Sequence, residues 1–189
     1  MARTESTMLP LGTPAPDFRL PDTDGGSVAR DDFNDAPGLL VAFICNHCPF
    51  VRHIRWELAA FAREYMERGL AVVAISANDA NTHPGDSPEK MAREKAEVGY
   101  PFPYLYDESQ QVARAYGAVC TPDFFLFDGE RRLFYRGRFD SSSPGRDDPV
   151  TGADLRAAAD ALLSGAQPPE QQRPSMGCNI KWKPGNAPG

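Results

Sequence analysis

A pair of cysteines stands between a strand pattern and a helix pattern. Residues 38–44 form a continuous apolar run, which is typical of a strand covered on both faces. The sequence Cys-Asn-His-Cys follows at 45–48, and Pro49 then opens a segment over 50–65 whose apolar residues recur at three- and four-residue spacing. Proline suits the first turn of a helix. The sequence therefore predicts a strand, a short dithiol turn and a helix in direct succession.

The position of the dithiol indicates thiol chemistry. Unpaired backbone N–H groups and the dipole at a helix start favour a thiolate, which is the attacking species in disulfide exchange. Cys45, just ahead of the helix, would gain this stabilisation, and His47 would add to it as a cation or hydrogen-bond donor. The alternative for His47 is an exposed histidine with little effect on the thiols. The alternatives for the two cysteines are inert residues or metal ligands. A zinc site would draw on four residues, namely Cys45, His47, Cys48 and Cys178.

The remaining patterns place this unit in an α/β fold. A second buried strand is predicted at 70–75, and turn residues between strand-like segments predict hairpins at 14–28 and 124–136. Further helices are predicted at 88–98, 109–116 and 154–163. This order predicts a mixed central sheet flanked by helices on both sides, with an N-terminal β-hairpin and an antiparallel edge.

The chain is interpreted as one domain followed by a tail. Residues 1–164 are expected to form the domain. Residues 165–189 are rich in Pro, Gly and Gln, so they are expected to form an extended tail that packs on this domain without regular structure of its own.

Two more cysteines and a proline extend the candidate site. Pro122 precedes a predicted strand, and beside a redox motif this indicates a cis Thr121–Pro122 bond that packs against the dithiol and presents a backbone edge to a substrate. The alternative is an ordinary trans proline. Cys120 and Cys178 are either passive small residues or auxiliary thiols. Cys120 would lie near the dithiol through its position next to Pro122, and Cys178 would reach the dithiol if the tail folds back over it.

Composition excludes several classes of function. The net charge is −6, so a nucleic-acid partner has no electrostatic support. Neither a secretory signal nor a membrane span is recognised in the sequence. A cytoplasmic location without membrane association is therefore expected, and thiols stay reduced there. The predicted chemistry needs no organic cofactor and no metal.

Several motifs together resemble the thioredoxin superfamily, in particular the peroxiredoxin-like redoxin branch of alkyl hydroperoxide reductase relatives. They are Pro-Asp-Phe at 16–18 with the hairpin that follows, the segment 43–49, and Thr121-Pro122. The segment 174–183 is similar to the tail of one subgroup. The resemblance implies a thioredoxin-like fold, Cys45 as nucleophile, Cys48 as resolving thiol and Thr121-Pro122 as a cis-proline loop.

The resemblance also implies partners and a redox range. The partners would be a protein or small molecule carrying a thiol or disulfide, together with a cellular dithiol reductant. A histidine just before the second cysteine is similar to protein disulfide isomerase, which is more oxidising than thioredoxin. A potential between about −270 and −120 mV is therefore expected.

The chain departs from the peroxiredoxin pattern Pro-x-x-x-Thr-x-x-Cys. Aligned on Cys48, the proline and threonine positions hold Val41 and Cys45; aligned on Cys45, they hold Gly38 and Ala42. The leading hypothesis is therefore a thiol–disulfide oxidoreductase, and a peroxiredoxin-like thiol peroxidase is the second. A metal-binding protein or metallochaperone acting through Cys45, His47 and Cys48 is the third.

Overall fold

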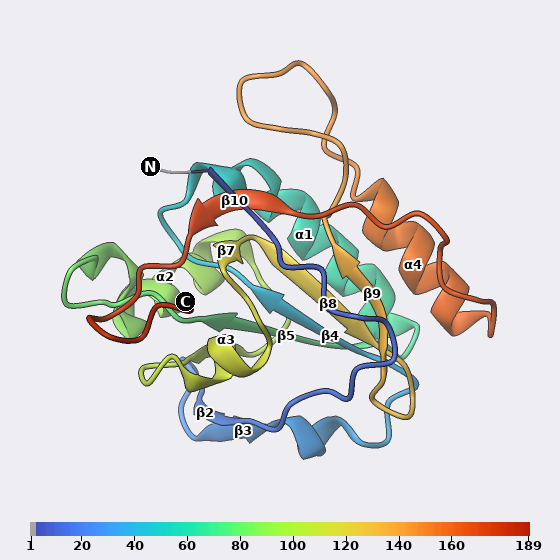
Figure 1. Ribbon diagram of the computed structural model, residues 1–189, viewed down its shortest axis with the longest axis horizontal. Coiled ribbons are helices and arrows are strands. Elements are labelled where there is room, and N and C mark those ends of the chain that lie inside the picture. Colours follow the sequence, from blue (N-terminus) through green and yellow to red (C-terminus); the bar gives the residue numbers. More distant parts are fainter. Residues whose placement is uncertain (1–2) are drawn as a thin grey trace.

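A five-stranded mixed sheet forms the centre of the computed structural model, which describes residues 3–189 (Figure 1). Its strand order is β6-β5-β4-β8-β9. β4, β5 and β6 run parallel, whereas β8 is antiparallel to both β4 and β9. The strands are β4 (Leu39–Phe43), β5 (Ala71–Ser76), β6 (Tyr104–Tyr106), β8 (Asp123–Phe127) and β9 (Leu133–Gly137). The predicted mixed sheet with an antiparallel edge is thus confirmed.

Helices and a hairpin cover the two faces of this sheet. The helices are α1 (Pro49–Glu67), α2 (Pro88–Val98), α3 (Gln111–Ala115) and α4 (Ala153–Leu163), with short 3-10 turns η1 (Arg30–Phe33) and η2 (Pro84–Asp86). Figure 1 shows α1 and α4 on one side of the sheet and the hairpin of β2 (Arg19–Pro21) and β3 (Ser27–Ala29) on the other. The predicted N-terminal hairpin is therefore confirmed.

Strand β4 is buried along its whole length because it faces two cores. Leu40 and Ala42 point into the core with α1, and Leu39, Val41 and Phe43 point into the core with the hairpin and α3. Side chains alternate across a strand, so a strand between two cores is apolar at every position. This explains the continuous apolar run before the dithiol.

A second, smaller sheet joins both ends of the described chain. Its order is β1-β10-β7, made by Arg3–Glu5, Met176–Asn179 and Cys120–Thr121, and both pairings are antiparallel. The expectation that residues 165–189 lack regular structure is therefore wrong at 176–179. These strands are very short and lack an alternating apolar pattern, so only the pairing of segments distant in sequence reveals them.

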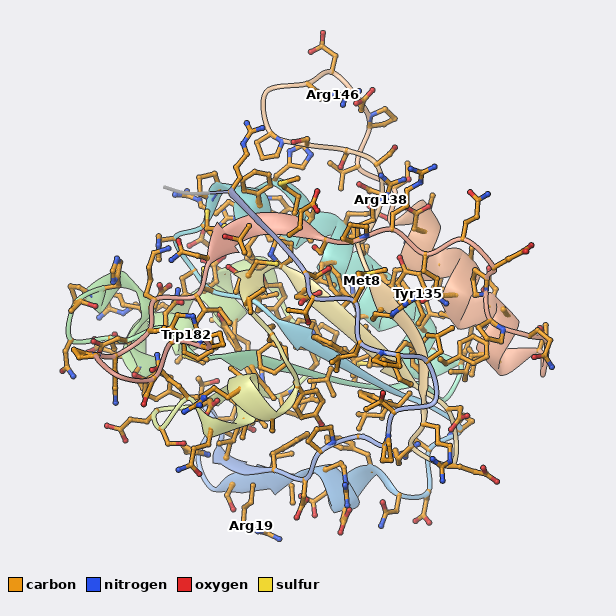
Figure 2. All side chains as sticks on the ribbon, viewed as in Figure 1. Met8, Arg19, Tyr135, Arg138, Arg146 and Trp182 are labelled. Atoms are coloured by element: carbon orange, nitrogen blue, oxygen red, sulfur yellow. The ribbon has the colours of Figure 1, made fainter. Side chains whose placement is uncertain are left out.

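The rest of the tail follows the body of the molecule. Ile180 is buried, and Trp182, labelled in Figure 2, packs partly buried against the core that contains the hairpin and α3. The segment with Arg146 extends away from the body instead. Among residues 3–189, no helix is long and apolar enough to cross a membrane.

Candidate active site

The dithiol lies against the Thr121–Pro122 peptide. Cys45 lies two residues after the end of β4, and Cys48 is the N-cap residue of α1. The Cys45 Sγ is 3.4 Å from the Thr121 Oγ1, and the Cys48 Sγ is 3.4 Å from the Thr121 carbonyl oxygen. The Thr121–Pro122 bond is cis, as expected. The two motifs that the sequence analysis selected are therefore in contact.

Both sulfur-bearing side chains are closed off from solvent. The exposed fraction is 2% for Cys45 and 0% for Cys48. The surrounding residues thus bury the dithiol at this strand–helix junction, so it is not exposed at the surface. A large substrate reaches it only after a local opening.

Asp86 is a site residue that the sequence analysis missed. Its buried carboxylate accepts hydrogen bonds from the Asn46 backbone N–H (2.8 Å) and the Asn78 side-chain amide (2.9 Å), and it pairs with Nδ1 of His47. A buried carboxylate needs such partners. In the sequence, Asp86 belongs to a polar loop, and nothing there sets it apart from the other polar residues. Its one local signal is its position just before Ser87 and Pro88, where α2 begins.

The Asp86 contacts set the charge of His47. The hydrogen bond to Asp86 raises the pKa of His47, so the imidazole stays protonated to a higher pH than an ordinary histidine. Burial opposes ionisation of Asp86, but hydrogen bonds from His47, Asn78 and Asn46 outweigh it and lower the pKa of Asp86. The His47 ring also stacks on His83, with 5.5 Å between ring centroids.

The two thiols of the dithiol have opposite pKa shifts. Hydrogen bonding from Cys45 lowers the pKa of Cys48 to about 5 against the effect of burial, and donors from Cys178 and the Val51 backbone add to this. The same hydrogen bond, together with burial and the charge of Asp86, raises the pKa of Cys45. The resting negative charge therefore falls on Cys48, which caps the helix, rather than on Cys45 as the helix-start argument expects.

The two auxiliary cysteines take different positions. Cys178 is 3% exposed, stands opposite Thr121 in the β10–β7 pairing, and is buried in the same core as Cys48. Cys120 pairs in register with Asn179, and its buried thiol faces the Pro122 carbonyl oxygen at 4.0 Å. Neighbouring strand residues point to opposite faces, so Cys120 points away from the side where Thr121 meets Cys45. Only Cys178 joins the dithiol.

A buried acid also lies beside the cis peptide. Asp123 is fully buried at the start of β8, and burial raises its pKa well above the ordinary value. Its Oδ1 accepts the Phe124 backbone N–H, whereas within residues 3–189 its Oδ2 has no hydrogen-bond partner. Burial thus favours the neutral form of Asp123, which stands opposite Phe43 of the strand that leads to the dithiol.

One group of possible metal ligands lies at the same place. The donor atoms of Cys45, His47 and Asp86 are all within 4.8 Å of one another. Asp86 stands there in place of Cys48, which the sequence analysis selected as a ligand. A structural zinc site takes four ligands, whereas this group offers three, two of which already bind each other. The metal hypothesis stays a prediction.

A cavity of about 350 Å³ opens next to the start of α1. Phe50 and His53 of α1 line it, together with Pro122. Three arginines, Arg3, Arg138 and Arg173, also line it, together with the acids Glu5 and Asp140. Through Phe50 and Pro122 the cavity adjoins the residues that follow Cys48 and Thr121 in the chain, although neither Cys45 nor Cys48 lines it.

Comparison with known proteins identifies the class. The mixed sheet with its covering helices is a thioredoxin-like fold. Two solved thioredoxin-family structures, each below 25% identical to this chain, superpose on it with TM-scores of 0.60 and 0.62. The AhpC/TSA family model matches residues 11–136, more than half of the chain, and the protein therefore belongs to the AhpC/TSA family. The predicted resemblance to the redoxin branch is confirmed.

Individual relatives differ in their described chemistry. A hypothetical protein from Sinorhizobium meliloti 1021 has a solved structure with a TM-score of 0.95 and 56% identity, covering 96% of this chain and 100% of that one. The thiol-disulfide oxidoreductase ResA of Geobacillus thermodenitrificans is 29% identical over 126 residues, 66% of this chain and 67% of ResA. The peroxiredoxin of Aquifex aeolicus is 30% identical over 119 residues, 61% of this chain and 51% of that protein.

Proposed function

We propose that this protein is a thiol–disulfide oxidoreductase whose working dithiol is Cys45–Cys48. The observation that carries the proposal is the contact of both sulfurs with Thr121, beside the start of α1. The opposite pKa shifts of the two thiols, which leave one proton between them, support it. Membership of the AhpC/TSA family and the similarity to ResA support a redox activity in general.

The proposed cycle uses the proton that the two thiols share. Transfer of this proton from Cys45 to Cys48 makes Cys45 a thiolate, which attacks a substrate disulfide and releases one substrate thiolate. The mixed disulfide is resolved when Cys48 loses its proton and attacks the Cys45 sulfur, which releases the second substrate thiolate. The substrate is reduced by two electrons and the dithiol becomes a disulfide. A dithiol reductant of the cell then reduces the Cys45–Cys48 disulfide by thiol–disulfide exchange and is itself oxidised to a disulfide.

The surroundings of Cys45 suit its role as nucleophile. The Thr121 hydroxyl, 3.4 Å away, can donate to the Cys45 thiolate. Nδ1 of His47 is occupied by Asp86, so the imidazolium is held in position near Cys45. Phe50 and Pro122 line the adjacent cavity, where the rest of a substrate would lie.

A thiol-trapping redox titration read by mass spectrometry tests this proposal. The expected result is a reversible Cys45–Cys48 disulfide, together with reduction of a model protein disulfide that Cys45→Ser and Cys48→Ser abolish. Thiols that stay reduced in every oxidising buffer, or serine variants as active as the unmodified protein, would overturn it.

A thiol peroxidase is a second candidate. It is favoured by the Thr121 hydroxyl beside Cys45, because a peroxidatic cysteine also works next to a hydroxyl donor, although the threonine of the peroxiredoxin pattern is absent from this chain. Peroxide consumption with a dithiol reductant distinguishes the two activities. A rate that depends on Cys45 and exceeds that of disulfide reduction would favour the peroxidase.

A further inference from the structure

We propose that Cys178 is a third redox cysteine, which converts a Cys45–Cys48 disulfide into a Cys48–Cys178 disulfide. The inference rests on the proposed function for its starting disulfide. It makes Cys48 the central thiol of three, with Cys45 on one side and Cys178 on the other.

The first support is the placement of Cys178. Strand β10 lies between β1 and β7, and its register sets Cys178 directly opposite Thr121, whose hydroxyl and carbonyl groups meet the dithiol. Cys178 and Cys48 are buried in one core, and the Cys178 thiol contributes to the lowered pKa of Cys48. Cys48 thus has two thiol neighbours that can each form a bond to it.

The second support is the number of contacts that hold this segment. Before β10, the Ser175 hydroxyl donates to the Pro122 carbonyl oxygen at 2.5 Å. After β10, the Ile180 N–H donates to the Val119 carbonyl (2.9 Å) and the Lys181 N–H to the Asn78 side chain (2.8 Å). Cys178 is therefore presented by a fixed strand rather than by a flexible tail. Such positioning lowers the entropic cost of an exchange reaction.

The third support is the close approach of β10 to the cis peptide. A Cβ atom on Gly177 would collide with the carbonyl oxygen of Thr121. Glycine at this position lets the two backbones approach, and the next residue then stands at the dithiol. The sequence Gly177-Cys178 thus has a geometric reason in the structure.

The exchange balances without an external oxidant. The Cys178 sulfur attacks the Cys48 sulfur, the Cys45–Cys48 bond breaks, and a Cys48–Cys178 bond forms. The Cys178 proton moves to the departing Cys45 sulfur. No electrons enter or leave, and one disulfide is exchanged for another. The outcome is an oxidised protein in which the nucleophile Cys45 is again a thiol and can attack a second substrate disulfide.

Peptide mapping of cysteine variants tests this proposal. Each protein is oxidised with glutathione disulfide, trapped in acid with N-ethylmaleimide and digested without reduction. In Cys45→Ser, the expected product is an intramolecular Cys48–Cys178 disulfide. In Cys178→Ser, it is Cys45–Cys48 alone. Cys48→Ser should form no intramolecular disulfide. Cys120→Ser is the matched control, because this buried neighbour of Thr121 points to the other face and both pairings should persist.

The outcomes separate the two proposals. If Cys178→Ser forms Cys45–Cys48 while folded Cys45→Ser leaves Cys48 and Cys178 alkylated, the third redox cysteine is overturned and the oxidoreductase stands. If Cys178→Ser forms no disulfide, the proposed function fails instead. The unmodified protein gives a test free of folding effects: the Cys48–Cys178 peptide should appear during its oxidation, and its absence would count against the exchange.

Discussion

The dithiol unit and the terminal sheet meet at one site but are built in opposite ways. The dithiol stands between β4 and α1, which are consecutive in the chain and each buried by a clear apolar pattern. The sheet β1-β10-β7 joins segments from both ends of the chain and its middle, each of two to four residues. The first unit carries the expected chemistry, and the second closes it and adds a thiol. Changes to each region should therefore have different consequences.

Loss of a dithiol sulfur should have the largest effect. Cys45→Ser is expected to lower kcat/KM for disulfide reduction by about 10³-fold or more, because the attacking thiolate is lost. Cys48→Ser should instead accumulate the mixed disulfide with substrate, which mass spectrometry of the trapped complex detects. Cys120→Ser is the control and should keep its activity. An active Cys45→Ser protein would contradict the role of this unit.

A side chain at Gly177 should disrupt the terminal sheet alone. Gly177→Ala is expected to cost about 2–3 kcal/mol of unfolding free energy, because its Cβ meets backbone rather than a flexible side chain. Urea unfolding measures this cost, and alkylation of Cys48 should become faster. Gly85→Ala is the matched control, since its Cβ would point into open space. Equal stabilities of the two variants would contradict the close approach of β10.

Removal of the Asp86 charge should alter the environment of the dithiol unit. Asp86→Asn is expected to return the pKa of His47 towards the ordinary value of about 6.5, as followed by NMR titration. Asp79→Asn, at another buried carboxylate of the same loop, should leave His47 unchanged. A His47 titration identical in the Asp86 variant and the unmodified protein would remove Asp86 from the site.

The same ion pair predicts a pH dependence of stability. The pKa of His47 is raised on folding, so its contribution is complete below the unfolded pKa of about 6.5 and is lost as pH rises through the folded pKa. The pKa of Asp86 is lowered, so its contribution is complete above about 3.9 and is lost as pH falls through the folded pKa. Unfolding free energies of Asp86→Asn and the unmodified protein should differ most between these limits.

Loss of one hydrogen bond that holds the tail should have the smallest effect. Ser175→Ala removes the buried bond to the Pro122 carbonyl and is expected to cost about 1 kcal/mol of unfolding free energy. Ser164→Ala, which removes an exposed hydrogen bond at the end of α4, is the control and should change stability by less. A larger cost for Ser164→Ala would contradict the assignment of Ser175 to the support of β10.

Much of the fold could be predicted because its main elements bury continuous or periodic apolar patterns. The strand at 38–44, the helix after Pro49 and the hairpin at 14–28 all appear in the structure with small changes of their limits. The helix expected at 109–116 is shortened to 111–115. Only the tail was wrong in kind. Its strand contains Gly177 and Cys178 and pairs with partners more than fifty residues away, so local propensity carries no signal for it.

By itself, the sequence determined that two thiols stand between a buried strand and a helix, because apolar periodicity and helix-start chemistry are local properties. It also indicated the cis Thr121–Pro122 bond beside them. Only the tertiary structure decided which groups surround the dithiol. Asp86 reaches His47 from a separate loop, and Cys178 reaches Cys48 from the end of the chain. Long-range pairing sets the local charge and burial of a thiol, and these quantities decide which sulfur carries the negative charge.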